Sequence, residues 1–369
     1  MNTYLKHIQK DFVSGGIDRV EKSLNKDFGI TFRSTYLDLE LRNPIIVAPG
    51  PLSQTTSQVV RAASSGFGGI VLKSVVGEDR NGDCSMKMLR TKPTYGRWVN
   101  DDEGNPVYHW NGGLDLRTFT EYLKFAEKAF KIGEELNFAV IPSFLCHLPK
   151  NIDKEDWKVE EWEYTVTKLS EAALPMYKDR KIIFEIDFCP FLKREKLAVD
   201  KKTILHWYRK TPKIVKENCP NSYVVPKIMN LDFGLNFQTE MVKAANQGGA
   251  DCVVIANRFF RKFADPNTKE SYFTAHGGRE LRIKNQNQIA KAKKAVNIPV
   301  SATGGTYSGK HVYEYLSLGA QNVQLVTYVM KFGFEESFKN IMFNPQNGLL
   351  ATLFTSKTEN PKWLNLSRK

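Results

Sequence analysis

The sequence predicts an α/β fold in which about eight parallel strands close into a (β/α)8 barrel. Short, nearly continuous apolar runs rich in β-branched residues recur along the chain, which is typical of parallel strands covered on both faces. Amphipathic stretches of helical period follow these runs, and eight such units favour a closed barrel over an open sheet. The predicted strands cover residues 44–50, 68–74, 138–145, 181–189, 223–229, 252–257, 299–305 and 322–329.

The predicted helices lie between and after these strands. Thr56 and Ser308 stand at helix starts as capping residues, and Gly66 and Gly319 follow helix ends, where a left-handed residue is common. We expect helices over residues 56–66, 117–136, 159–179, 203–218, 236–247, 285–296, 308–318 and 334–343.

Two kinds of segment depart from the strand–helix repeat. Residues 1–35 precede the barrel and predict an N-terminal helical extension of one or two short helices, so that the barrel domain covers 36–369. The alternating stretch 35–41 predicts a small strand pair. The connections 75–116 and 258–283 are long and follow strands, so they emerge at the C-terminal mouth, where barrels build their active sites.

Composition excludes several classes of protein. The chain has 369 residues, 41% of them hydrophobic and 25% charged, which excludes a disordered, collagen-like or small disulfide-rich protein. Its five cysteines are widely spaced without a CxxC pair, so we expect no metal site and a reducing, cytoplasmic location. No apolar run approaches the ~20 residues needed to span a bilayer.

The net charge of +13 is the one unusual compositional feature. Such a charge favours anionic partners, among them phosphate-bearing cofactors and RNA. No run of five or six basic residues occurs, however, so we interpret the charge as a lysine-rich solvated surface. A nucleic-acid partner is therefore not favoured.

The ends of the predicted strands carry the candidate chemistry. Gly304 and Gly305 follow the seventh strand and Thr327 lies in the eighth, where barrels commonly bind a phosphate. Lys73 and Lys227 interrupt apolar runs, and a buried ammonium group must be paired or must serve an anion. The alternative for each lysine is a side chain that reaches solvent from the rim.

Two more polar residues end predicted strands. Cys189 follows the fourth strand, where a thiol can donate or accept a proton or can be a small buried hydrophobic residue. Asn257 ends the sixth strand, where its amide can bind a ring carbonyl or imide or can form a local loop hydrogen bond.

These residues, in this order, resemble the dihydroorotate dehydrogenase family, which includes the pyrimidine-reducing domain of dihydropyrimidine dehydrogenases. The resemblance covers residues 36–335 and implies an FMN-dependent barrel. It rests on Asn43-Pro44, Gly50-Pro51-Leu52, Lys73-Ser74, Glu185-x-x-x-Cys189-Pro190, Pro226-Lys227, Asn257, Gly277-Gly278, Thr303-Gly304-Gly305-x-x-Ser308-Gly309 and Gly319-Ala320-x-x-Val323-Gln324.

The resemblance implies a role for each matched residue. Lys227 would approach the N1/O2 edge of the flavin, and Lys73 would lie between flavin and substrate as a catalytic residue. Cys189 would exchange a proton with the substrate carbon next to the one that exchanges hydride with flavin N5. The remaining flavin residues, the last four of them at the phosphate, would be Ala48, Gly50, Ser74, Gly278, Gly304, Gly305 and Thr327.

At the substrate the chain departs from the family pattern. Asn257 matches an asparagine that binds the pyrimidine, but Asp187 and Phe191 stand where the family has two further asparagines. A third family asparagine falls at Trp110 or Asn111. Because a carboxylate repels another carboxylate, Asp187 predicts a substrate other than orotate, one with N–H groups or positive charge.

Three functions remain open on the sequence. The favoured one is an FMN oxidoreductase acting on a pyrimidine-like or other small heterocycle, as a homodimer with a separate electron-transfer partner. The alternatives are a flavoenzyme similar to tRNA dihydrouridine synthases and a flavin-binding subunit without turnover.

Overall fold

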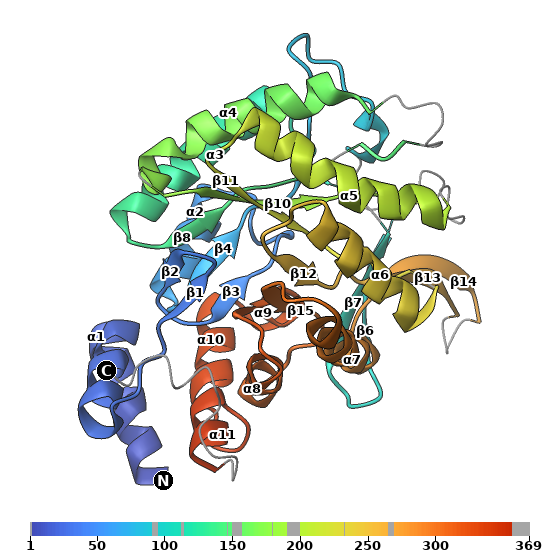
Figure 1. The fold of residues 1–369 in the computed structure, drawn as a ribbon. Coiled ribbons are helices and arrows are strands. Elements are labelled where there is room, and N and C mark those ends of the chain that lie inside the picture. The colour runs from blue at the N-terminus through green and yellow to red at the C-terminus, as the bar shows by residue number, and fades with distance from the viewer. Residues whose placement is uncertain are drawn as a thin grey trace.

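The computed structural model describes residues 2–90, 95–111, 114–145, 147–149, 157–178, 180–189, 200–231, 233–264 and 269–355. Within this part of the chain, parallel strands surrounded by helices form the predicted (β/α)8 barrel (Figure 1). The barrel strands are β3 (Ile45–Val47), β4 (Gly69–Val71), β8 (Ala139–Ile141) continued by β9 (Ser143–Leu145), β10 (Ile182–Asp187), β11 (Ser222–Pro226), β12 (Val253–Ile255), β15 (Val300–Thr303) and β16 (Asn322–Leu325).

Pairing between neighbouring strands closes the barrel. β3 pairs in parallel with both β4 and β16, which joins the first and last strands of the barrel. Lys227 forms a parallel bridge with Val254, which connects the end of β11 to β12. The short strand β5 (Val75–Val76) extends the second strand position beside β9. The paired segments are shorter than the apolar runs of the sequence because each run continues into loop residues at the mouth.

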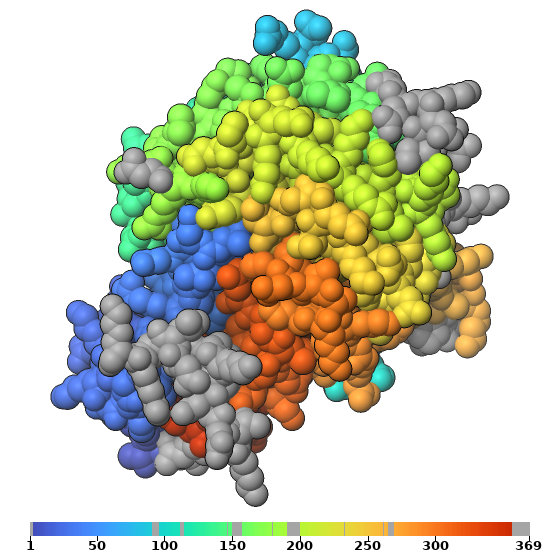
Figure 2. Space-filling model, viewed as in Figure 1, coloured from blue at the N-terminus to red at the C-terminus, as the bar shows by residue number. Residues whose placement is uncertain are grey.

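The predicted helices are all present around the barrel. They are α2 (Thr56–Ser64), α3 (Phe119–Glu135), α4 (Val159–Tyr177), α5 (Lys201–Asn218), α6 (Gly234–Gln247), α7 (Arg279–Ala295), α8 (Gly309–Ser317) and α10 (Phe334–Phe343). Side chains of α4 to α7 form a continuous surface over one side of the barrel (Figure 2).

Some helix boundaries differ from the prediction. The side chain that caps α2 is Thr55, not Thr56, because Thr55 and Gln58 form a reciprocal capping box. Ser308 caps α8 as predicted, by accepting a hydrogen bond from the His311 amide. α7 begins six residues before position 285, directly after Gly278. Short helices that the sequence did not predict follow β16, namely α9 (Thr327–Phe332) and α11 (Leu349–Thr355).

The N-terminal residues form a helix and the expected strand pair. Helix α1 (Asn2–Phe28) is kinked at Gly15 and Gly16, whose backbone angles are not helical. The antiparallel strands β1 (Ser34–Tyr36) and β2 (Leu39–Leu41) follow it. Phe12 packs against Phe338 and Phe343 of α10, so α1 lies beside the C-terminal helices (Figure 1).

The two long connections pair with each other across the mouth of the barrel. One forms β6 (Tyr95–Asn100) and β7 (Pro106–Asn111), and the other forms β13 (Phe259–Ala264) and β14 (Ser271–His276). Ala275 of β14 pairs with Trp110 of β7, which joins the hairpins into one antiparallel sheet, hereafter the mouth sheet. Among the described residues, no helix has the length and apolar character needed to cross a bilayer.

Candidate active site

A cavity of about 410 Å³ lies at the carboxyl ends of the barrel strands. Trp110, Phe260 and Ala275 of the mouth sheet line it, together with residues at the ends of the barrel strands and others from the long connections and α7. Of the predicted site residues, twelve line this cavity: Ala48, Gly50, Lys73, Ser74, Asp187, Cys189, Lys227, Asn257, Gly278, Gly304, Gly305 and Thr327.

Glycines form one end of the cavity, together with Thr327. Gly278, Gly304 and Gly305 have φ values of +87°, +101° and +63°, in the region that favours glycine. A Cβ atom on Gly305 would lie 2.4 Å from the carbonyl oxygen of Gly278, and one on Gly304 would lie 2.9 Å from Leu281 Cδ2. Side chains are therefore excluded, and the main chain itself faces the cavity. We call these four residues the glycine end.

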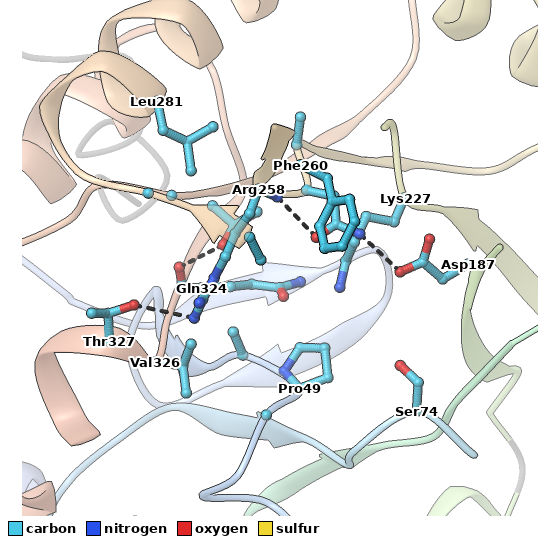
Figure 3. A pocket seen from close by; sticks show the side chains of 18 of the residues that line it. Pro49, Ser74, Asp187, Lys227, Arg258, Phe260, Leu281, Gln324, Val326 and Thr327 are labelled. Atoms are coloured by element: carbon cyan, nitrogen blue, oxygen red, sulfur yellow. Dashed lines mark hydrogen bonds between the residues drawn. The ribbon is translucent and has the colours of Figure 1, made fainter. Parts of the chain in front are cut away.

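Asp187 and Lys227 lie at the opposite end of the cavity (Figure 3). Asn257 is hydrogen-bonded to Asp187, and the charges of Lys227 and Asp187 act on Lys73. We call these four residues the charged end. Lys73 and Lys227 are only 7% and 8% exposed, so neither reaches solvent from the rim. Both continue apolar strand ends, Lys73 just after β4 and Lys227 just after β11. Both lysines therefore lie inside the mouth, where they line the cavity.

Hydrogen bonds hold Asp187 and Asn257 in fixed orientations. Asp187 Oδ2 accepts a hydrogen bond from Asn257 Nδ2 at 3.1 Å, and Asp187 Oδ1 accepts one from the Phe188 amide at 2.8 Å. Asn257 Nδ2 also donates to the sulfur of Met229, and Asn257 Oδ1 accepts from the Arg258 amide at 2.9 Å. Both donor positions of Asn257 are thus used, so the pair offers only acceptor lone pairs to a ligand.

The pKa values of Asp187 and Lys73 are shifted toward pH 7. Burial raises the pKa of Asp187 to about 6, although the positive charge of Lys227 opposes the shift. Burial, with repulsion from Lys227 and Arg258, lowers the pKa of Lys73 to about 8. Between these values Asp187 is an anion and Lys73 a cation.

Cys189 lies at the rim of the charged end, two residues after Asp187. Its side chain is half-buried and packs beside a small apolar cluster of Val76, Met86 and Leu145. It lines the cavity, so a proton donor or acceptor at this position can reach a bound ligand. The structure thus combines the two interpretations of this residue, an apolar contact and an accessible thiol.

Two predicted substrate residues have no described side chain. Phe191 lies outside the described residues, and the same holds for the side chain of Asn111. Of the two alternatives at that position, Trp110 lines the cavity. Its indole ring lies 5.0 Å from Lys73 Nζ and 5.7 Å from the Arg258 guanidinium, within the range of cation–π contacts.

The sequence analysis missed Arg258 and Tyr307, which also line the cavity. Arg258 Nη2 donates to Thr327 Oγ1 at 3.3 Å, and Nη1 donates to the carbonyl of Tyr108 in β7 at 3.2 Å. The available signal was that Arg258 directly follows Asn257 at a strand end, but the argument from buried cations considered only lysines within apolar runs.

A buried polar network forms the floor of the cavity. Glu185 of β10 is 1% exposed, and its Oε1 accepts hydrogen bonds from Tyr36 at 2.9 Å and from Gln324 Nε2. Burial raises the pKa of Glu185 above its usual range. Gln324 lines the cavity, and its Oε1 has no hydrogen-bond partner among the described residues. A ligand donor can therefore satisfy this oxygen.

Known proteins are similar in sequence to this chain. The family profile described as Dihydroorotate dehydrogenase matches residues 31–344. A dihydroorotate dehydrogenase B (NAD(+)) catalytic subunit of Pyrococcus horikoshii is 27% identical, covering 89% of this chain and 91% of the relative. The corresponding protein of Thermococcus kodakarensis is 25% identical, with 80% and 86% covered. The NAD-dependent dihydropyrimidine dehydrogenase subunit PreA of Escherichia coli is 21% identical, with 84% and 70% covered. The chain is an oxidoreductase that belongs to the dihydroorotate dehydrogenase family.

Proposed function

We propose that the chain is an FMN-dependent oxidoreductase that interconverts a CH–CH and a C=C bond in an uncharged pyrimidine-like ring. The observation that carries the proposal is that one cavity joins a glycine-lined end to an end with two buried lysines and an accessible cysteine. When bound, FMN supplies the hydride transfer through its N5 atom.

The residues present fit a flavin with a phosphate. The glycine end exposes main chain beside the Thr327 hydroxyl, which suits a phosphate group. The unpartnered Gln324 Oε1 can accept a hydrogen bond from a ring N–H group. Lys227 would place a positive charge at the ring, where it favours the anionic reduced form. Membership in the dihydroorotate dehydrogenase family supports the same cofactor class.

We assign the proton transfer to Cys189. Its thiol lines the cavity beside Asp187, so it can reach a substrate carbon at the charged end. Lys73, which also lines the cavity, can orient the substrate by donating hydrogen bonds to its carbonyl oxygen. Transfer of a hydride and a proton needs at least two things: the flavin and the substrate must be oriented toward each other, and one proton donor must be in place.

The substrate class follows from the acceptors at the charged end. Asp187 and Asn257 offer acceptor atoms only, so they favour a ring that presents N–H groups. Asp187 is ionised above its pKa of about 6 and would repel a substrate carboxylate. We therefore propose a ring such as uracil or its dihydro form, with ring N–H groups and no carboxylate, in preference to orotate.

A separate electron-transfer partner is part of this proposal. The relatives from Pyrococcus horikoshii and Escherichia coli are named as subunits, the first as a catalytic subunit. The cysteines of this chain are too widely spaced for an iron–sulfur cluster of its own. Electrons would therefore enter or leave through another chain.

The proposal is tested with the full chain loaded with FMN. We expect the protein to retain the flavin through gel filtration and to be reduced by light under anaerobic conditions. Rapid mixing of the reduced protein with uracil should then reoxidise the flavin, whereas orotate should do so at least tenfold more slowly.

Each outcome has a distinct meaning. A protein that takes up no FMN refutes the assignment as a flavoenzyme. Flavin retention without reoxidation by uracil, orotate or other unsaturated lactams refutes the enzymatic function and favours a flavin-binding subunit. Equal or faster reoxidation by orotate refutes only the substrate class.

A further inference from the structure

The Arg258 guanidinium is a cation inside the cavity that has no acidic partner among the described residues. Among the residues that the structure describes, its side chain forms two hydrogen bonds, to Thr327 Oγ1 and to the Tyr108 carbonyl, and no ion pair with a carboxylate. Three of the five guanidinium N–H groups therefore have no hydrogen-bond acceptor there. The side chain is partly buried, and a partly buried charge without a counter-ion is costly, so an anion beside it is favoured.

The position of the guanidinium identifies which ligand group it faces. Its hydrogen bond to Thr327 places it at the glycine end, and Tyr307, which follows the glycine pair Gly304-Gly305, also lines the cavity. Asp187 and Lys227 lie on the other side of the cavity (Figure 3). The anion nearest to Arg258 in a loaded site is thus the group at the glycine end, not a substituent of the substrate ring.

We propose that Arg258 binds the phosphate of the flavin, and that it makes the chain select FMN over riboflavin. This inference rests on the proposed function, because it requires a flavin in the cavity. The guanidinium would add charge-assisted hydrogen bonds to those of the main chain at the glycine end. Planar N–H groups suit two phosphate oxygens better than a single ammonium does.

A purely structural role for Arg258 gives a different expectation. The side chain links the end of β12 to Tyr108 of the mouth sheet, so its removal could loosen the roof of the cavity. Such loosening would weaken FMN and riboflavin alike. Loss of a phosphate contact weakens FMN alone, because riboflavin has the same ring and ribityl chain without the phosphate.

The experiment measures the dissociation constants of FMN and riboflavin by quenching of flavin fluorescence in the flavin-free full chain. We expect Arg258→Gln to weaken FMN about 10- to 100-fold and riboflavin less than threefold. Arg258→Lys should recover part of the FMN affinity. The matched control is Arg279→Gln, since Arg279 contacts Asp102 and Glu103 near the mouth sheet but does not line the cavity.

The FMN-to-riboflavin ratio decides the outcome. An unchanged ratio in Arg258→Gln, with both ligands weakened or neither, overturns the inference and leaves the flavoenzyme proposal intact. Failure of the unaltered chain to bind either flavin refutes both. If Arg258→Gln does not fold, the melting temperature of the unaltered chain should rise with inorganic phosphate, and Arg258→Lys should reduce that rise. No rise in the unaltered chain overturns the inference.

Discussion

The two ends of the cavity are built from different parts of the chain. At the glycine end the main chain forms the surface, because Gly278, Gly304 and Gly305 approach each other too closely for side chains. At the charged end the side chains of Lys73, Asp187 and Lys227 form the surface, and the backbone lies behind them.

This difference separates two functions within one site. Main-chain N–H groups can donate hydrogen bonds to a phosphate, and this binding does not depend on the rest of the ligand. A surface of charged side chains depends on residue type, so one substitution there changes which ring is accepted. Under the proposed function, the glycine end would bind the cofactor and the charged end would select the substrate. The following predictions test this division, from the largest expected effect to the smallest.

Replacement of Cys189 should affect turnover and leave the cofactor in place. We expect Cys189→Ala to lower the rate of substrate-dependent flavin reoxidation by about 100-fold or more, because general acid–base catalysis contributes on that scale. The flavin absorbance of the purified protein should not change. Cys84→Ala is the control, since Cys84 packs against the same apolar cluster but does not line the cavity. If Cys189→Ala and the unaltered chain were reoxidised by substrate at equal rates, Cys189 would not be the proton donor.

Replacement of Gly305 should affect the cofactor first. Gly305→Ala places a Cβ 2.4 Å from the Gly278 carbonyl at a φ of +63°, so we expect a loss of stability of about 1–3 kcal/mol and weaker FMN binding. Denaturant unfolding and FMN titration measure the two effects. Gly249→Ala is the control, because Gly249 also has a positive φ but has no atom within 4 Å of its Cβ position. The same FMN affinity in both variants would contradict the role of the glycine end.

The charged end should respond to pH within a defined window. Asp187 loses its acceptor charge below its pKa of about 6, and Lys73 loses its proton above its pKa of about 8. Binding of uracil to the FMN-loaded protein should therefore be tightest between these values and weaken up to about tenfold per pH unit outside them. Asp187→Asn should abolish the acid limb and tighten orotate. An acid limb that persists in Asp187→Asn would exclude Asp187 as its origin.

The smallest effect is expected at Trp110, whose ring contacts Lys73 at the charged end and, at a longer distance, Arg258. Its contact with Lys73 is of the cation–π type, worth about 0.5–1 kcal/mol at exposed sites, and the Trp110 side chain itself is only partly buried. We expect Trp110→Leu to weaken uracil binding about two- to fivefold and FMN binding by a smaller factor. Trp98→Leu is the control, since Trp98 is an exposed residue of neighbouring β6. If Trp110→Leu weakened FMN binding more than uracil binding, Trp110 would serve the cofactor and not the substrate.

Several site residues were predictable because they continue a local pattern. Lys73 and Lys227 each follow an apolar run, and in parallel strands the carboxyl ends meet at one edge. Gly304 and Gly305 follow the seventh strand, and adjacent glycines indicate a backbone conformation that other residues rarely adopt. Each of these signals is a local pattern of about ten residues or fewer, so no knowledge of the tertiary structure is needed to find it.

The mouth sheet and Arg258 were not predictable in this way. Ala275 pairs with Trp110 across 165 positions of sequence, and neither connection has a pattern that specifies the other as its partner. The hydrogen bonds of Arg258 reach Tyr108 and Thr327, residues from two other segments. Long-range contacts of this kind depend on which surfaces the folded barrel brings together.

Local periodicity was thus sufficient to predict the eight strand–helix units. The polar residues at the strand ends were sufficient to predict where the cavity lies. Folding alone produced the roof of that cavity and the acceptor pair Asp187–Asn257. The physical reason is that the apolar period of a strand or helix depends only on which face of that element is buried. A hydrogen bond between two loops, in contrast, forms only after the closed barrel has positioned both loops.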